Sequence, residues 1–240
     1  MTTNPFDVID ATWPAASLHR AGGFVVREGL GGGKRVSAAS VAGAWTPADI
    51  ELAEAVHHAL GQCPLFMIRP EDAALDAALA ARGYDVVDPV VVLAAPVAAV
   101  ATEAPPPISA FCHWPPLAIQ RDLWAEGGIG PARLAVMARA APPKCALLGR
   151  TGDRAAGVGF VALHQGVAMV HAMHVLPALR RQGLARWMLR AAALWAAEAG
   201  AQTLALVVTQ ANAGALALYR GIGLAEVSRY HYRQAPEVAA

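Results

Sequence analysis

The spacing of apolar residues in the second half of the chain predicts strands first and then a helix. Apolar segments bounded by turn residues predict three successive antiparallel strands. These strands are Cys145–Gly149, Gly157–Leu163 and Val167–Val175. From Leu184 onwards, apolar residues recur at intervals of four, three and four, which predicts an amphipathic helix that ends at Gly200.

After this helix the pattern predicts one more strand, one more helix and a last strand. Leu204–Thr209 is short and continuously apolar, as a buried strand is. Asn212 is a good N-cap for a helix through Tyr219, and Gly223 closes that helix before a strand near Val227–Tyr232. The order predicts a mixed α/β (α+β) fold with a mostly antiparallel sheet flanked by helices.

A proline-rich segment divides the chain. Residues Val100–Ser109 include three successive prolines and break every periodic pattern, which predicts an extended connector. We therefore expect two domains, residues 1–104 and 105–240. In the second domain, Leu117–Ala138 predicts a helix in two pieces, interrupted by Gly127–Pro131.

The first domain repeats part of the second at an offset of 140 residues, the distance from Gly83 to Gly223. The same offset pairs Asp72 with Asn212 and places the apolar segment Leu65–Ile68 over another apolar segment. We interpret this match as a weak internal duplication. Two unrelated helix-strand-helix units in an alanine-rich chain are the alternative.

The charge balance excludes a large basic surface. The 240 residues include Lys+Arg 19 and Asp+Glu 18, a formal net charge of +1, and 56% of the residues are hydrophobic. Nucleic acids and anionic membranes are bound by an uncompensated excess of Lys and Arg, so neither is expected as a partner. The high apolar fraction excludes a disordered chain and predicts a large core.

No segment reads as a membrane span or an export signal. The longest apolar segment, Val90–Ala101, is interrupted by Pro96 and is shorter than the roughly 20 residues that span a bilayer. The N-terminal residues lack a cationic region followed by an apolar one, so a cytoplasmic location is expected. Cys63, Cys112 and Cys145 are odd in number and widely spaced, which predicts buried free thiols and no metal site.

Two glycine-rich segments match nucleotide-binding loops only in part. Around Gly31–Lys34, Glu28 stands where the first glycine of a phosphate loop belongs, and Arg35 replaces the Ser or Thr that would hold Mg²⁺. Gly157–Ala162 matches G-x-G-x-x-A but lies inside an apolar strand and opens no helix. Neither segment is therefore expected to bind phosphate.

The segment Arg180-Arg181-Gln182-Gly183-Leu184-Ala185 is different, because it follows a strand and opens the amphipathic helix. The first backbone N–H groups of a helix are unsatisfied and attract anions. Gly183 allows close approach, and Arg180, Arg181 and Arg186 add positive charge that a helix N-terminus disfavours unless an anion is present. The sequence predicts a diphosphate site here.

These residues carry a resemblance to a known family. Val175-x-Pro177-x-x-Arg180-Arg181-x-Gly183-x-Ala185, followed by Asn212-x-x-Ala215-x-x-x-Tyr219-x-x-x-Gly223, resembles the acetyl-CoA-binding core of the GNAT superfamily of N-acetyltransferases. The resemblance covers about Cys145 to Tyr232. It departs at Leu224, where an aromatic residue commonly follows the glycine.

The resemblance implies a site for acetyl-CoA as acyl donor, with no metal. Arg180 to Arg186 would hold the CoA diphosphate, the strand edge at Met173 to Val175 the pantetheine arm, and Asn212 would contact the cofactor. The implied cofactor-binding residues are Met173, Val175, Arg180, Arg181, Gln182, Gly183, Leu184, Ala185, Arg186 and Asn212. Tyr219 matches the tyrosine that protonates the departing CoA thiolate in many members.

A catalytic base is also needed, because an amine substrate is mostly protonated at neutral pH. His171 and His174 lie on one predicted strand, where residues three apart point to opposite faces, so only one can face the cleft. The segment is similar to that of arylalkylamine N-acetyltransferases, which implies His171 as the base and His174 as a core or opposite-face residue. That family has a second histidine where this chain has Met169, so a water or a backbone carbonyl is the alternative base.

The first domain lacks these parts, because Leu79 stands at the place of Tyr219, and Ser40 and Val41 replace the two arginines. We interpret it as a degenerate GNAT-like copy, in a layout similar to that of mycothiol synthases. The resemblance implies acetyl transfer to a primary amine by direct attack. The alternatives are acetylation of a peptide N-terminus and a non-catalytic acyl-CoA sensor, and a homodimer is one assembly that the layout allows.

Overall fold

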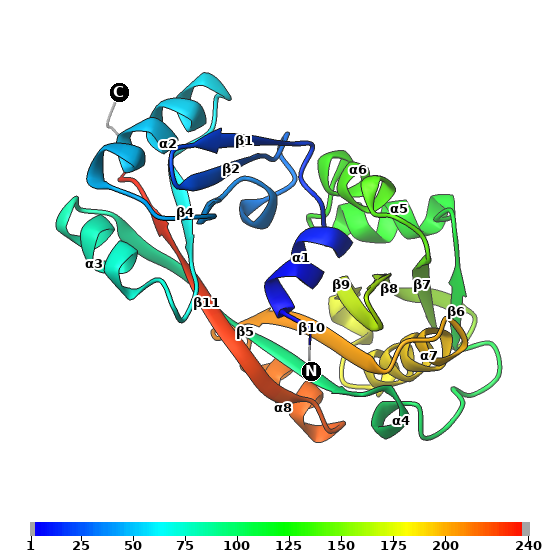
Figure 1. Cartoon of the computed structure of the whole chain (residues 1–240). Helices are drawn as coiled ribbons and strands as arrows, with labels where there is room; N and C mark the ends of the chain where they lie inside the picture. Colours follow the sequence, from blue (N-terminus) through cyan, green and yellow to red (C-terminus); the bar gives the residue numbers. More distant parts are fainter. Residues whose placement is uncertain (1–2, 237–240) are drawn as a thin grey trace. The chain divides into compact units, whose positions relative to one another are not determined.

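The structure is a computed structural model that describes residues 3–236 (Figure 1). The chain forms two compact units. Unit 1 consists of the described residues up to Pro14, of Val92–Val208 and of Asn212–Val227, and unit 2 of Ala15–Val91, Thr209–Ala211 and the described residues from Ser228 onwards. Strands β5 (Asp85–Pro96) and β11 (Ala225–Gln234) each contain residues of both units.

These units differ from the predicted domains 1–104 and 105–240, because the first described residues belong to unit 1 and the last described residues belong to unit 2. The N-terminal helix α1 (Pro5–Thr12) contacts the sheet of unit 1. At the other end, His231–Gln234 of β11 pair antiparallel with Leu65–Ile68, which form β4 in unit 2. Segments from distant parts of the sequence therefore complete each unit.

Unit 1 is built on strands in the order β5-β10-β9-β8-β7-β6. After β5, these strands are β6 (Ala110–His113), β7 (Lys144–Thr151), β8 (Arg154–His164), β9 (Val167–Val175) and β10 (Thr203–Thr209). The predicted antiparallel meander is confirmed in β7, β8 and β9, and β10 runs parallel to β9. The remaining helices of the unit are α4 (Val97–Val100), α5 (Ala118–Glu126), α6 (Pro131–Arg139), α7 (Leu184–Glu198) and α8 (Ala213–Gly221).

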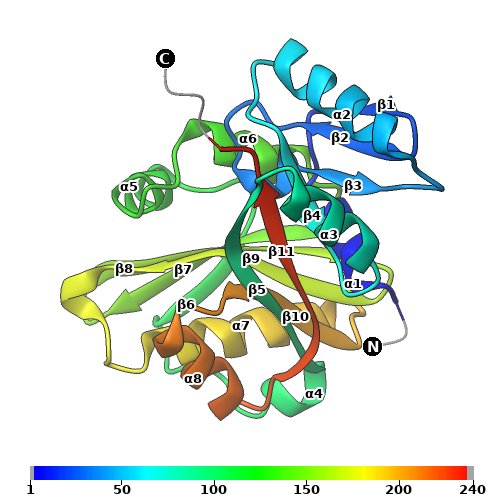
Figure 2. The ribbon, with the colours of Figure 1, turned by 90° about the vertical axis from the view of Figure 1, so that its left-hand side faces the viewer.

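Helices cover both faces of the β7–β9 meander. Figure 2 shows α7 on one side of these strands and α5 and α6 on the other. Glycines let α7 approach closely, because a Cβ atom added at Gly149 or Gly157 would lie 2.5 or 2.8 Å from the sulfur of Met188. Met188 itself is fully buried, so the predicted amphipathic stripe of α7 faces the sheet.

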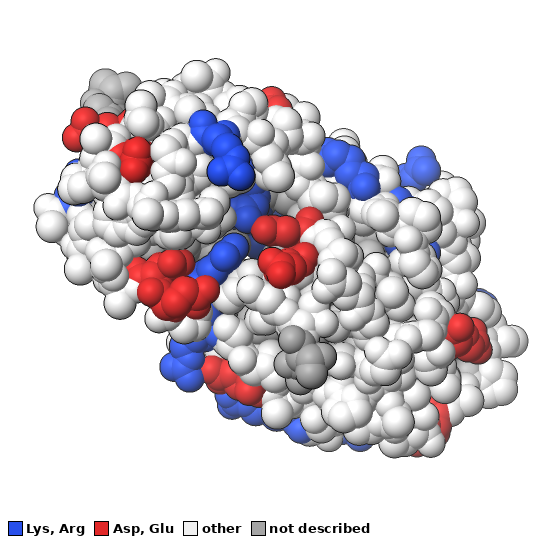
Figure 3. Space-filling model, in the orientation of Figure 1, with Lys and Arg blue, Asp and Glu red and all other residues white. Residues whose placement is uncertain are grey.

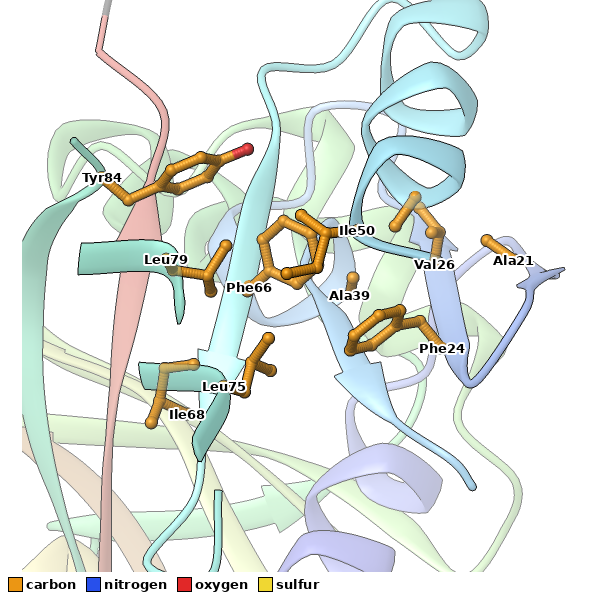
Figure 4. Packing of buried hydrophobic residues seen from close by; sticks show 11 residues of the cluster. Ala21, Phe24, Val26, Ala39, Ile50, Phe66, Ile68, Leu75, Leu79 and Tyr84 are labelled. Atoms are coloured by element: carbon orange, nitrogen blue, oxygen red, sulfur yellow. The ribbon is translucent and has the colours of Figure 1, made fainter. Parts of the chain in front are cut away.

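Unit 2 has its own sheet and its own core. Its strands lie in the order β1-β2-β3-β4-β11, with β1 (Ser17–Ala21), β2 (Phe24–Glu28) and β3 (Ala39–Val41) preceding β4. Its helices are η1 (Lys34–Val36), α2 (Pro47–Ala59) and α3 (Ala73–Ala81). Phe24, Phe66 and Tyr84 pack edge to face in the buried cluster of Figure 4, with ring centroids 5.5 and 5.8 Å apart along the series.

The secondary structure repeats at the offset found in the sequence. Helix α3 covers Ala73–Ala81 and α8 covers Ala213–Gly221, so both ends differ by 140 residues. The following strands β5 and β11 begin at Asp85 and Ala225, again 140 residues apart. The match in element order and bounds supports a duplication over two unrelated units.

The three cysteines are free, but they are not all buried as predicted. Cys145 is buried, Cys112 is partly exposed, and Cys63 is exposed in the loop after α2. A position between a helix and a strand gives Cys63 less cover than a position within an element would.

The surface of residues 3–236 carries charges of both signs. On the face drawn in Figure 3, Lys and Arg atoms are interspersed with Asp and Glu atoms over a mostly uncharged surface. None of the helices in this part of the chain is long and apolar enough to cross a bilayer. Nor do these residues contain a group of three or more His, Cys, Asp and Glu side chains placed to hold a metal ion.

Candidate donor site

Strand β9 contains a bulge that decides where its histidines point. Phe160 of β8 pairs with His171 and Val158 pairs with His174, so two residues of β9 lie opposite Gly159. The bulged Ala172 has φ 51°, in the left-handed region. Because Phe160 and Val158 are two residues apart and share a face, His171 and His174 also share one. The prediction that they point to opposite faces is therefore wrong, since it assumed a regular strand.

His171 is held in the interior of unit 1. Its ring is 2% exposed and lies 5.0 Å from the ring of Trp13, centroid to centroid. The Thr12 hydroxyl donates its proton to the Val8 carbonyl at 2.6 Å, so it can only accept from His171 Nε2, at 2.9 Å. Nε2 therefore carries a hydrogen and cannot accept a substrate proton.

A sharp turn follows β9. A short 3₁₀ helix, η2 (Pro177–Leu179), leads into Arg180, whose Nε donates to the Val175 carbonyl at 2.9 Å. Arg181 and Gly183 then adopt positive φ angles of 66° and 83°. A left-handed residue immediately before the helix favours glycine at 183, as the sequence provides.

The N-terminus of α7 lacks a side-chain cap. Gly183 occupies the N-cap position, and glycine has no side chain that could accept a hydrogen bond from the first turn. That turn also contains no acidic residue. Open backbone donors and the positive end of the helix dipole therefore face outward beside Arg180, Arg181 and Arg186.

A cavity of about 1080 Å³ lies at this helix terminus, entirely within unit 1. Most of the predicted site residues line it, namely Met173, Val175, Arg180, Arg181, Gly183, Leu184, Ala185, Arg186, Asn212 and Tyr219. The predicted residues Gln182 and His171 are not among its lining residues. The structure also brings His174, Trp187, Arg190 and Glu103 to the cavity, which sequence reasoning missed.

Helix α8 supplies the wall opposite the turn. Asn212 caps this helix as predicted, because its side-chain oxygen accepts from the Ala215 N–H at 3.1 Å. Tyr219 lies two turns further along and is 9% exposed. Burial raises the pKa of its phenol, so the hydroxyl keeps its proton at neutral pH and can donate it.

The cavity wall contains a fourth arginine, Arg190, which has its own counter-charge. Arg190 Nη1 lies 2.6 Å from a carboxylate oxygen of Glu103, in the segment between α4 and β6. The guanidinium also lies over the Trp187 ring, 4.8 Å from its centroid. The helical spacing of Trp187 and Arg190 along α7 was the one sequence signal for this feature.

An apolar-walled cavity at an uncapped helix N-terminus with several arginines suits an elongated ligand that ends in phosphates. Comparison with known families gives the same indication, because residues 112–224 match the acetyltransferase (GNAT) family. This segment is a GNAT acetyltransferase domain. It contains the whole cavity wall except Glu103.

Solved structures with the same fold cover nearly all of the chain. A GCN5-related N-acetyltransferase from Kribbella flavida is 20% identical, with a TM-score of 0.72, and the match covers 99% of this chain and 98% of that one. A functionally unknown conserved protein from Staphylococcus epidermidis is 10% identical, with a TM-score of 0.73 and 99% of both chains covered. A tandem GNAT protein from the clavulanic acid biosynthesis pathway is 13% identical, with a TM-score of 0.63, 99% of this chain covered and 89% of that one. At these identities the likeness shows the fold, and it extends over both halves of the chain.

No curated protein sequence matches the chain.

Proposed function

We propose that the protein transfers an acetyl group from acetyl-CoA to a primary amine. The observation that carries this proposal is the single cavity in which the uncapped α7 N-terminus, three arginines and Tyr219 meet. The turn at Gly183 and the arginines would hold the CoA diphosphate, and the bulged end of β9 would hold the pantetheine arm. Asn212 caps α8 and would contact the cofactor.

The reaction would proceed by direct attack. The amine nitrogen attacks the thioester carbonyl carbon, the carbon–sulfur bond breaks, and Tyr219 gives its proton to the CoA thiolate. The Tyr219 phenol is protonated at neutral pH, as this acid role requires. No acetyl-enzyme intermediate is proposed, so initial-rate patterns should be sequential, and ping-pong patterns with a trapped acetyl-enzyme would contradict the mechanism.

The first repeat would act as a degenerate partner without a donor site. Leu79 takes the place of Tyr219 and is fully buried in the core of unit 2. The helix that would bind phosphate in this half, α2, has its N-terminus occupied by its own Asp49, whose carboxylate accepts from the Thr46 N–H at 2.8 Å. We therefore propose one molecule of acetyl-CoA per chain, and isothermal titration that gives two sites would contradict this.

Thermal unfolding with acetyl-CoA, CoA, ATP and NADH in separate samples tests the donor. A ligand at about 100 times its Kd stabilises a protein by about 2.7 kcal/mol, so only the two CoA forms should raise Tm. Release of CoA is then followed with primary amines and with peptides that have a free N-terminus. Binding of CoA without turnover of any acceptor would favour an acyl-CoA sensor instead.

A further inference from the structure

We infer that His174, and not His171, is the catalytic base that takes the proton from the acceptor amine. This inference rests on the proposed function and adds a catalytic residue that the sequence pattern did not single out. It is carried by the bulge in β9, by the surroundings of the two imidazoles, and by a glycine that makes room for one of them.

The bulge brings both histidines to one face of β9, but only one of them reaches the cavity. His174 lines the cavity together with Met173 and Tyr219. His171 lies deeper along the strand, with Thr12 and Trp13 packed against its ring. A base must reach the proton that it removes, and of the two histidines only His174 borders the cavity.

The imidazole of His174 has an open nitrogen. Its Nε2 is buried and has no hydrogen-bond partner among residues 3–236. Buried polar atoms are nearly always paired, so an open one beside a cavity marks a position that a ligand or a water completes. In His171, by contrast, the bond to Thr12 already occupies Nε2.

Gly127 shapes the position of this ring. A Cβ atom added at residue 127 would lie 2.6 Å from Cγ and Nδ1 of His174. The φ angle of Gly127 is −80°, which any residue adopts, so glycine is required here for space and not for conformation. The end of α5 is therefore fitted to the imidazole, which holds it in one orientation.

Burial and the adjacent Arg180 favour the neutral form of His174. Burial lowers the pKa of its imidazole, and the Arg180 guanidinium lowers it further. Glu126, at the end of α5, acts in the opposite direction but does not outweigh them. A neutral imidazole at pH 7 can accept a proton as the amine attacks, while Tyr219 gives a proton to the thiolate. The site therefore gains one proton and loses one. Proton exchange with solvent then returns His174 and Tyr219 to their starting protonation states.

The test compares His174→Gln with His171→Gln, a matched change three residues away on the same face. With 2-phenylethylamine, spermine and a tetrapeptide as acceptors, we expect His174→Gln to lower kcat/KM about 100-fold or more at pH 7. The fall of kcat/KM at acidic pH, where the base takes up a proton, should disappear in this variant. His171→Gln should lower Tm but keep that fall, and both variants should keep the Kd for CoA within about twofold.

Two outcomes would overturn the inference. One is turnover of His174→Gln within about threefold of the parent with the same pH profile. The other is NMR of imidazole nitrogens in the CoA complex that shows His174 doubly protonated at pH 7, a measurement that needs no acceptor. If CoA fails to raise the Tm of the parent protein, the proposed function is at fault. The inference fails separately when CoA binds and either of the two outcomes is found.

Discussion

The two repeats use the same elements around opposite kinds of helix N-terminus. In unit 1, α7 begins after Gly183 with no side-chain cap and no acidic residue in its first turn. In unit 2, α2 begins after Thr46, whose N–H and hydroxyl donate to the Asp49 carboxylate at 2.8 and 3.2 Å. One helix end is open to a foreign anion, and the other is closed by an anion of its own.

The second half of each repeat shows the same contrast. Tyr219 on α8 lines the cavity, while its counterpart Leu79 on α3 packs into the apolar cluster of unit 2. Both helices have the same length and begin at equivalent positions. A shared backbone therefore supports a binding wall in one unit and a closed core in the other, and the difference lies in a few side chains.

The largest expected effect comes from the acid. Tyr219→Phe should lower kcat by about 10²–10⁴-fold, because the CoA thiolate would leave without a proton donor. The Kd for acetyl-CoA, measured by isothermal titration, should stay within about twofold. Unchanged kcat would remove Tyr219 from this role.

Tyr84→Phe is the matched control in the other repeat. The Tyr84 hydroxyl donates to Glu54 at 2.7 Å, so its loss should cost about 1 kcal/mol of unfolding free energy. Its kcat should equal that of the parent. A similar loss of kcat in both variants would mean that the loss in Tyr219→Phe reflects general damage to the fold.

The next effect concerns the open helix end. Gly183→Glu forces a side chain into a backbone with φ 83° and brings a carboxylate to the anion position, so the Kd for CoA should rise about 100-fold or more. Gly43→Glu is the equivalent change at the 140-residue offset, where an added Cβ meets no atom within 4 Å. It should leave the Kd unchanged, and equal losses at both glycines would contradict the proposed difference between the repeats.

Much of this contrast could be read from the sequence. The meander, the glycine before α7 and the Asn212 cap follow from local patterns that the structure confirms. The bulge at Ala172 could not be predicted, since alanine gives no signal for a left-handed backbone. Without it, the faces of His171 and His174 were assigned by simple alternation, and that assignment failed.

Two parts of the fold had no local signal either. Strand β6 and helix α4 are only four residues long each, and they flank the segment predicted as a connector. The pairing of β11 with β4 joins residues more than 150 positions apart. Such pairings depend on tertiary packing and not on periodicity, which explains why the compact units differ from the predicted domains.

A smaller effect tests the two helix ends by their stability. Asp49→Ala should lower the free energy of unfolding by about 1 kcal/mol, because the N-terminus of α2 loses the carboxylate that accepts from Thr46. Arg186→Ala removes a cation from the first turn of α7 and should raise it by about 0.3–1 kcal/mol in the free protein, while it weakens CoA binding. Urea denaturation without ligand measures the free energy of unfolding of both variants. A change of the same sign in both would show that the N-termini of α2 and α7 do not differ in the charge that they favour.

The smallest effect concerns the far end of the cavity, where the Glu103 carboxylate competes with a phosphate for Arg190. Glu103→Gln should lower the Kd for CoA a few-fold at low salt and less at high salt, because it removes a repulsive charge from an exposed position. Asp88→Asn is the control, since Asp88 forms an exposed ion pair with Lys34 at 2.8 Å in unit 2. Each variant loses one surface ion pair, so each should change the unfolding free energy by about 1 kcal/mol or less.

Only the Glu103 variant should bind CoA more tightly, because only that ion pair borders the cavity. Tighter CoA binding in both variants would show that the net charge of the protein causes the effect.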